Sequence, residues 1–457
     1  MHFFDIEPKS VPPINTKHRT IKSPYPSAEI ANILKKSFEL MPNSMNDQLP
    51  IVWDKASGYK IFDRSGNQWI DLTSTIFVAN IGHAHPRVTA AINRTAEQGL
   101  LNAYNYPTEI RNQLAERITS IAPKKLNQVI FLSTGSESTE AAIKIMTING
   151  AKINPKKKII AGFEGSFHGK TMGSQMLGGK HGGKAWIGYQ NPNFVTLPYP
   201  YPWVLKDLKM SGHEFFHYSI RKVFDDQGLN IDDIAGFMAE SYQGWCAIFF
   251  PKDYISALRQ WTIDHECLLA FDEVQAGFGR TGKYFGFDWY DVNPDLICCG
   301  KALSSSIPVS AVIGPEHLLN LDPSLNSTHG GNPVGMAASI AVLDVIHDED
   351  LLSASRRKGE IISNFLSDWT RDCEYIDSYY GQGAVWGIFL KKPGSSDLEV
   401  ELVDKAIEQA MLRGVCSIRT CSGTFKLGPP INIPDDALVE SLTVLRESLD
   451  YCINGRK

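Results

Sequence analysis

The sequence predicts an α/β protein, in which helices flank a mostly parallel seven-stranded sheet and both chain ends build a smaller α+β domain. Its 457 residues suffice for two or three domain-sized units. Between about residues 85 and 347, short apolar runs alternate with segments of helical periodicity. That alternation is typical of a parallel sheet covered by helices on both faces. Beyond about residue 335 the order changes to a smaller set of helices and strands.

Seven apolar runs are the candidate strands of the sheet, and each has the length of a buried strand. In chain order they are QVIFLS (128–133), KIIAGF (158–163), FVTLP (194–198), IAGFMAE (234–240), CLLAFDEV (267–274), DLICCG (295–300) and SAVIG (310–314). Helical stretches fall between them, such as 138–151 and 251–266. We therefore expect strands and helices to alternate along this part of the chain.

The two chain ends have a different character. Residues 1 to about 45 are rich in Pro and Lys with one amphipathic helix, and residues 51–72 alternate apolar and polar residues around two turns, as in a β-meander. A long helix is expected at 332–348 and another at 435–453. We therefore expect an N-terminal arm and part of the small domain (1–75), a large domain (76–335) and a C-terminal small domain (336–457).

Composition excludes several classes of protein. The formal net charge is −5 and the isoelectric point about 6.2, which is not the signature of a nucleic-acid-binding or membrane-surface protein. No apolar run is long enough for a transmembrane helix, and the N-terminus does not resemble a signal or transit peptide. Six of the eight cysteines lie in or beside apolar stretches, and none forms C-x-x-C. We expect a cytoplasmic protein with reduced thiols and no metal site.

Ligands of open α/β sheets bind beyond the carboxyl ends of the strands, so the residues that follow each apolar run are informative. After the first run come Thr134, Gly135, Ser136 and Glu137, then a helix. Thr134 and Glu137 fit a capping box. This helix start is either a capped terminus and no more, or a phosphate site built from free N–H groups and the helix dipole.

Two glycine-rich segments partly match known nucleotide-binding motifs. EGSFHGKT (164–171) has one residue too few for a P-loop, but it places Phe167 and His168 at the sheet edge, where an aromatic side chain is either packing or a stacking platform. GFGRTG (277–282) matches G-x-G-x-x-G, yet no helical stripe follows it. A nucleotide-binding oxidoreductase is therefore a weak alternative, which an NAD(P)H-binding assay would test.

Charged residues follow two of the most apolar runs. Asp272 and Glu273 end one strand, and Lys301 follows another. A buried carboxylate needs a cation or a donor, so an ion pair between Lys301 and Asp272 is one interpretation. The other is a ligand with a protonated ring nitrogen beside Asp272 and a desolvated, nucleophilic amine at Lys301.

Together these strand ends supply a phosphate-binding helix, an aromatic platform, a buried acid and a buried lysine, which is the set that pyridoxal phosphate requires. The chain then resembles a class III (omega-type) aminotransferase of the fold-type-I pyridoxal-phosphate enzymes over roughly residues 50 to 450. The segments that carry the resemblance, in order, are NIGHAHP (80–86), FLSTGSESTEAAIK (131–144), SFHGKT (166–171), AFDEVQAGFGRTG (270–282), PDLICCGKAL (294–303) and STHGGNPVG (327–335).

The resemblance implies a role for each matching residue. Lys301 forms the Schiff base and moves the substrate proton, and Asp272 pairs with the pyridinium nitrogen. Phe167 and Val274 pack on opposite faces of the ring, and Gln275 reaches its phenolic oxygen.

Other residues are assigned to the phosphate and to the surroundings of the ring. Gly135 and Ser136 hold the phosphate, and Thr328 completes that site from the neighbouring subunit, which implies a homodimer with its active site at the subunit interface. Glu240 matches a family glutamate behind the ring.

The chain departs from the family at two positions. Trp245 stands where many members carry a glutamate, and Lys426 stands where an arginine binds the α-carboxylate of glutamate or 2-oxoglutarate. Lysine cannot make the planar bidentate contact of arginine. The departures predict a pocket suited to a bulky or neutral substrate in at least one half-reaction. Arg419, seven positions earlier, is an alternative source of the guanidinium.

We therefore expect a transaminase that exchanges an amino group between an amine or amino acid and an oxo acid or aldehyde by a ping-pong mechanism. Its partners are a small-molecule donor and acceptor. A racemase, epimerase or aminomutase is the nearest alternative, because the same residues serve each reaction and the pocket selects the bond. A catalytically inactive binding protein is a remoter one.

Overall fold

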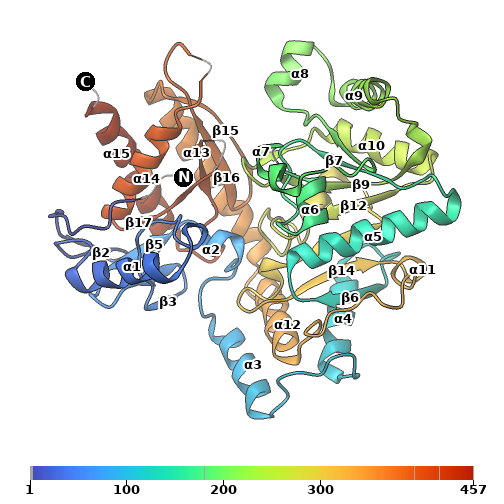
Figure 1. Cartoon of the computed structure of the whole chain (residues 1–457). Helices are drawn as coiled ribbons and strands as arrows, with labels where there is room; N and C mark the ends of the chain where they lie inside the picture. The colour runs from blue at the N-terminus through green and yellow to red at the C-terminus, as the bar shows by residue number, and fades with distance from the viewer. Residues whose placement is uncertain (1–3, 180, 396, 421–422, 456–457) are drawn as a thin grey trace. The chain divides into compact units, whose positions relative to one another are not determined.

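The computed structural model describes residues 4–179, 181–395, 397–420 and 423–455. The chain divides into two units (Figure 1). The larger unit is Pro86–Leu352, and the smaller combines Met1–His85 with Ser353–Lys457. Within the described residues, no helix is long and apolar enough to span a bilayer.

The larger unit is built on the predicted seven-stranded sheet, whose strand order is β6-β14-β13-β12-β9-β7-β8. All strands run parallel except β14, which is antiparallel to both of its neighbours. Every predicted strand is present, as β6 (Gln128–Leu132), β7 (Ile159–Phe163), β8 (Phe194–Leu197), β9 (Ile234–Glu240), β12 (Leu268–Asp272), β13 (Leu296–Cys299) and β14 (Ser310–Gly314). The mostly parallel α/β architecture is confirmed.

Strand β9 shows why these runs are apolar throughout. Its Met238 joins a buried cluster with Ile145 and Met146 of helix α5 (Gly135–Ile153). The preceding Phe237 instead packs on Trp261 of helix α10 (Lys252–Asp264). Successive side chains of a strand point to opposite faces, so helices cover both faces of the sheet.

Further helices complete the larger unit. They are α3 (Pro86–Glu97), α4 (Glu109–Ile121), α6 (Met172–Leu177), α7 (His181–Lys184), α8 (Pro202–Leu208), α9 (Gly212–Gln227), α11 (Glu316–Leu319) and α12 (Pro333–Asp348), with a short hairpin of β10 (Tyr242–Gln243) and β11 (Ile248–Phe249). The expected C-terminal small domain (336–457) includes most of the α12 segment. This segment lies instead in the larger unit, because its apolar residues pack against α3 and α4.

The smaller unit contains two sheets. One joins β1 (Ile14–Asn15), β2 (Thr20–Ile21), β5 (Gln68–Asp71), β4 (Lys60–Phe62) and β3 (Lys55–Ser57), with β17 (Val415–Cys416) paired parallel to β5. The other joins β15 (Ile376–Gln382), β16 (Val385–Leu390), β19 (Thr424–Leu427) and β18 (Ile418–Arg419). Its helices are α1 (Ala28–Leu40), α2 (Ser74–Phe77), α13 (Leu351–Asp372), α14 (Val400–Leu412) and α15 (Asp435–Asn454). The β-meander is confirmed as β3, β4 and β5.

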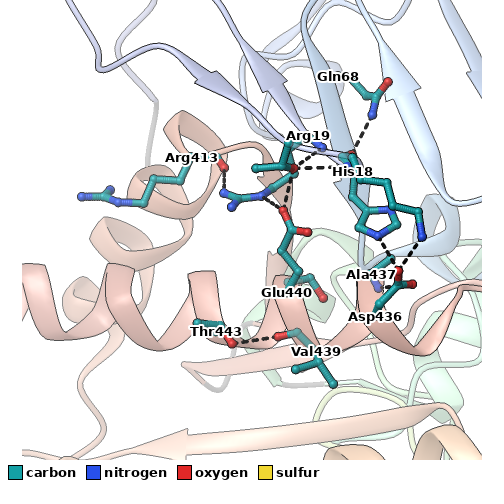
Figure 2. Close-up of polar contacts among 12 residues, drawn as sticks. His18, Arg19, Gln68, Arg413, Asp436, Ala437, Val439, Glu440 and Thr443 are labelled. Atoms are coloured by element: carbon teal, nitrogen blue, oxygen red, sulfur yellow. Dashed lines mark hydrogen bonds and ion pairs between the residues drawn. The ribbon is translucent and has the colours of Figure 1, made fainter.

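Polar contacts tie the N-terminal arm to the C-terminal helix of this unit (Figure 2). Arg19 Nε donates to Glu440 Oε1 at 2.6 Å, and its Nη1 donates to the carbonyl of Arg413 at 2.5 Å. His18 Nε2 lies 3.1 Å from Asp436 Oδ2 in the first turn of α15. Since Trp69 Nε1 also donates to Met411 O at 2.9 Å, both chain ends belong to one folded body.

The cysteines are buried thiols in large part. Among the described residues, six are buried and Cys452 is partly buried, all without disulfides, whereas Cys421 lies outside the described residues. Burial raises the pKa of the Cys298 and Cys299 thiols well above the usual value. These two thiols are therefore neutral and serve as packing in β13.

Candidate active site

A cavity of about 280 Å³ opens at the carboxyl ends of the parallel strands in the larger unit. It is lined by Thr134, Gly135, Ser136, Phe167, His168, Gly169, Lys170, Glu240, Asp272, Val274, Gln275 and Lys301. The fold thus brings together every predicted cofactor residue except Thr328. The lining residues lie at or just beyond the carboxyl ends of five strands, β6, β7, β9, β12 and β13. This is where ligand sites of open α/β sheets are expected.

The first turn of α5 forms one wall. Thr134 is its N-cap, and the capping box with Glu137 is complete, since Glu137 Oε2 accepts from Thr134 N at 2.8 Å. Gly135 must be small here, because a Cβ at this position would lie 2.8 Å from Val274 Cγ1. The turn therefore presents its remaining N–H groups and the positive end of a 19-residue helix to the cavity, which suits a phosphate.

Asp272 is held by two donors at the end of β12. His168 Nδ1 lies 2.8 Å from Asp272 Oδ2, and Val274 N donates to Oδ1 at 3.1 Å. The His168 side chain is buried, and its Nε2 has no hydrogen-bond partner among the described residues. Since Thr139 Oγ1 also donates to the His168 carbonyl at 2.7 Å, helix α5 fixes the loop that carries this histidine. A carboxylate held this way can face a cationic ring nitrogen.

Lys301 follows β13 in a 3₁₀ turn (Lys301–Leu303) and adopts a left-handed backbone with φ of 40°. Non-glycine residues avoid this region, so the surrounding structure must hold the strain. Burial lowers the pKa of Lys301, while the charges of Asp272 and Glu240 act in the opposite direction. The amine is therefore more easily deprotonated than a surface lysine, as nucleophilic and general-base chemistry requires.

Glu240 and Phe167 form another wall of the cavity. Glu240 Oε2 accepts from the backbone N–H of Phe167 at 3.0 Å, and its Oε1 accepts from Gly244 N at 3.2 Å. The carboxylate thereby fixes the backbone of Phe167. Trp245, which does not line the cavity, packs edge-on to the Phe167 ring at a centroid distance of 5.4 Å.

Glu273 supports the site from behind. It is fully buried, and it accepts from Gly286 N at 2.7 Å and from Phe287 N at 3.0 Å as well as from the hydroxyl of Ser241. Burial raises its pKa to about 7, against the opposing effect of the three hydrogen bonds. Glu273 thus anchors two loops beside the strand that ends in Asp272.

The remaining predicted residues lie elsewhere. Lys426 belongs to β19 of the smaller unit, where its Nζ lies 4.5 Å from the centre of the Phe77 ring and both side chains are buried. Arg419, in β18, forms an ion pair with Asp404 of α14. Thr328 is exposed in the loop before α12, where the neighbouring Ser327 Oγ donates to Glu137 Oε1 at 3.0 Å.

One residue of the site has a role that the sequence pattern did not indicate. For His168 the pattern left packing and stacking both open, whereas the structure places its ring against the Asp272 carboxylate. Its position next to Phe167, in the loop after a buried strand, is the signal that points to a site residue. Among the described residues, no group of three or more His, Cys, Asp or Glu side chains is placed to hold a metal ion.

Comparison with known proteins identifies the family to which the chain belongs. The Aminotransferase class-III model matches residues 41–449. A probable 4-aminobutyrate aminotransferase of Bacillus subtilis is 30% identical over 86% of this chain and 92% of its own length. Isoleucine 2-epimerase of Lentilactobacillus buchneri is 31% identical over 89% of this chain and 91% of its own length. A transaminase structure from the marine bacterium Virgibacillus superposes with a TM-score of 0.83 at 24% identity, covering 93% of this chain and 99% of that one. The chain therefore belongs to the class-III aminotransferase family, whose enzymes use pyridoxal phosphate.

Proposed function

We propose that this protein is an aminotransferase that moves an amino group between an amine or amino acid and an oxo acid or aldehyde in two successive half-reactions. One observation carries the proposal. A single cavity combines the Lys301 amine, the Asp272 carboxylate and the first turn of α5. Amino-group transfer with pyridoxal phosphate needs a group of each kind.

The donors and surfaces of this cavity fit the cofactor. Gly135 and Ser136, at the start of α5, would hold its phosphate, and Asp272 would face the ring nitrogen. Phe167 and Val274 would cover the two faces of the ring. Bound pyridoxal phosphate withdraws electrons from the substrate and so makes its Cα–H acidic.

Gln275 would contact the phenolic oxygen of the ring, and Thr328 would reach the phosphate of a second copy of the chain. Thr328 is exposed and does not line the cavity of its own chain. This supports a homodimer in which each copy completes the site of the other. A cytoplasmic location is part of the same proposal, since most of the described thiols are buried and none of them forms a disulfide.

Within this site, Lys301 would take the proton from the substrate Cα and deliver it again in the second half of the transfer. Its lowered pKa favours the neutral amine that proton removal requires. Asp272 would keep the ring nitrogen protonated, and His168 holds the Asp272 carboxylate in place through its Nδ1 at 2.8 Å. Substitution of Lys301 should therefore abolish turnover.

Racemisation or epimerisation is the second candidate, because a relative named isoleucine 2-epimerase is as similar in sequence as the aminotransferase relative. The two reactions part at one step. A racemase returns the proton to the substrate Cα, whereas a transaminase releases a carbonyl product and needs a second carbonyl substrate. The residues that line the cavity serve both outcomes.

The experiment follows the visible absorption of the holoenzyme while amines and amino acids are added one at a time without an acceptor. A transaminase loses its visible band with its own donor and regains it with an oxo acid or aldehyde. A racemase instead incorporates solvent deuterium at Cα and keeps the band. Lys301→Ala is the matched control, and retention of turnover in this variant, or no visible band in wild type supplied with cofactor, would refute the proposal.

The substrate of at least one half-reaction is proposed to be bulky or uncharged. Trp245 adds an indole against the Phe167 ring, and Lys426 lies under the Phe77 ring rather than presenting a planar guanidinium. The Arg419 guanidinium is engaged by Asp404. The double variant Trp245→Glu with Lys426→Arg should therefore gain activity with 2-oxoglutarate. Unchanged use of 2-oxoglutarate would show that these positions do not select the substrate.

A further inference from the structure

Helix α9 carries a pair of histidines that the proposed reaction does not use. His213 and His217 are four residues apart in the sequence HEFFH (213–217), so they lie on the same side of the helix. Between them, Phe215 and Phe216 are buried and fix the orientation of the helix. The two imidazole rings are 4.8 Å apart between centroids, with an angle of 61° between their planes.

Both rings are available to a ligand. His213 is exposed and His217 is partly buried. The ring nitrogens of both residues form no hydrogen bond to another described residue.

Charged groups of both signs lie near the pair. A helix N-terminus and the nearby Arg221 disfavour a cation. Against them, the Asp253 carboxylate accepts from the backbone N–H of His213 at 2.9 Å, which places a negative charge at this helix end. One turn further on, Lys222 is paired with Asp226 at 2.9 Å.

The pattern H-E-x-x-H also occurs in zinc hydrolases, where the glutamate acts as the general base and a third protein ligand completes the site. Here Glu214 closes the capping box of α9, its Oε2 accepting from Ser211 N at 2.8 Å and from Ser211 Oγ at 2.9 Å. No third protein ligand stands beside the pair among the described residues. The arrangement therefore supports metal binding by two imidazoles and not hydrolysis.

We propose that His213 and His217 form a surface site for one divalent transition-metal ion, such as Zn²⁺ or Cu²⁺, with water in the remaining coordination positions. Imidazole nitrogen is a preferred ligand of both ions, and the spacing of four residues lets small side-chain rotations bring one nitrogen of each ring to about 2.0–2.1 Å from the same ion. Cu²⁺ should bind more tightly than Zn²⁺. The site lies outside the cavity that contains Lys301, so the proposal is independent of the proposed reaction.

The test is calorimetric titration of chelator-treated holoenzyme with Zn²⁺ alone and with Cu²⁺ alone. Wild type should bind one more ion per chain than the double variant His213→Ala with His217→Ala. The single variants His213→Ala and His217→Ala should each weaken metal binding at least about tenfold. Removing a residue that only hydrogen-bonds to a metal ligand already weakens binding by about that factor, and each of these variants removes a ligand itself. The electron paramagnetic resonance spectrum of the Cu²⁺ form should show two nitrogen ligands in wild type and fewer in the variants.

Two controls make the result specific. His347→Ala removes a single exposed histidine in the last turn of α12 and should leave the affinity unchanged. Glu214→Gln should also leave it unchanged, and a large loss there would contradict the two-imidazole site. Equal metal binding by wild type and by the folded double variant, checked by circular dichroism, would overturn the proposal.

Discussion

The buried carboxyl of Glu273 makes a testable contribution to the pH dependence of stability. It lies at the end of β12 with no solvent exposure, and its three hydrogen bonds come from Ser241, Gly286 and Phe287. Burial raises the pKa from 4.5 to about 7. The folded protein therefore binds this proton more tightly than the unfolded chain does.

The sign and the size follow from that difference. Stability from this group is present below pH 4.5, and it is lost as the pH rises through about 7. At about 1.4 kcal/mol per pKa unit, the full loss is about 3 kcal/mol, of which most falls between pH 5 and pH 8. Glu273→Gln cannot titrate, so it should lack this loss. Its amide nitrogen would replace one acceptor and leave one of the three donors unpaired, a penalty of about 1–3 kcal/mol that does not depend on pH.

The assay is urea unfolding of holoenzyme at fixed ionic strength, followed by circular dichroism at pH 5 and pH 8. Glu273→Gln should be less stable than wild type at pH 5. Between pH 5 and pH 8, the free energy of unfolding of the variant should rise relative to that of wild type by about 2–3 kcal/mol. Glu360→Gln, at an exposed position of α13, is the matched control and should show no such change. A gap for Glu273→Gln that stays constant between the two pH values would refute the raised pKa.

Three further predictions address other parts of the fold. Thr75 is exposed and has a left-handed backbone with φ of 53°, so Thr75→Gly should raise the free energy of unfolding by about 1 kcal/mol. Thr443→Gly, in the right-handed helix α15, is the control and should lower the free energy of unfolding. Thermal melting curves measure both effects, and destabilisation by Thr75→Gly would contradict the strain argument. His168→Phe removes a hydrogen bond to the Asp272 carboxylate that is worth about 1.5–3 kcal/mol. The cofactor should therefore dissociate about tenfold faster or more, measured as the loss of bound cofactor on gel filtration. His168→Asn should restore part of the cofactor retention. Glu440→Gln should cost about 1 kcal/mol and speed hydrogen exchange in 14–21, and unchanged exchange there would show that this carboxylate does not hold the arm.

Much of the fold and of the candidate site could be predicted from the sequence, because those features depend on local patterns. A strand buried on both faces must be apolar along its whole length, which made all seven strands of the large sheet recognisable. The capping box of Thr134 and Glu137 spans four residues and was recognised the same way. Polar residues directly after apolar strands then indicated Asp272 and Lys301, since strand ends of a parallel sheet meet at one edge.

Other features were decided by contacts between residues far apart in the chain, which no local pattern encodes. His168 meets Asp272 across 104 positions, and only the neighbouring placement of their strands reveals the pair. The left-handed turn Ser74–Phe77 consists of residues that prefer other conformations, and it is held by contacts such as that of Ser74 Oγ with the Gly428 carbonyl. The sequence by itself thus determined the strands, the helix cap and the types of side chain gathered at the candidate site, because side-chain polarity and spacing specify them. The tertiary structure alone decided which partner each buried polar group meets, because a buried group takes its partner from whichever segment the packing places beside it.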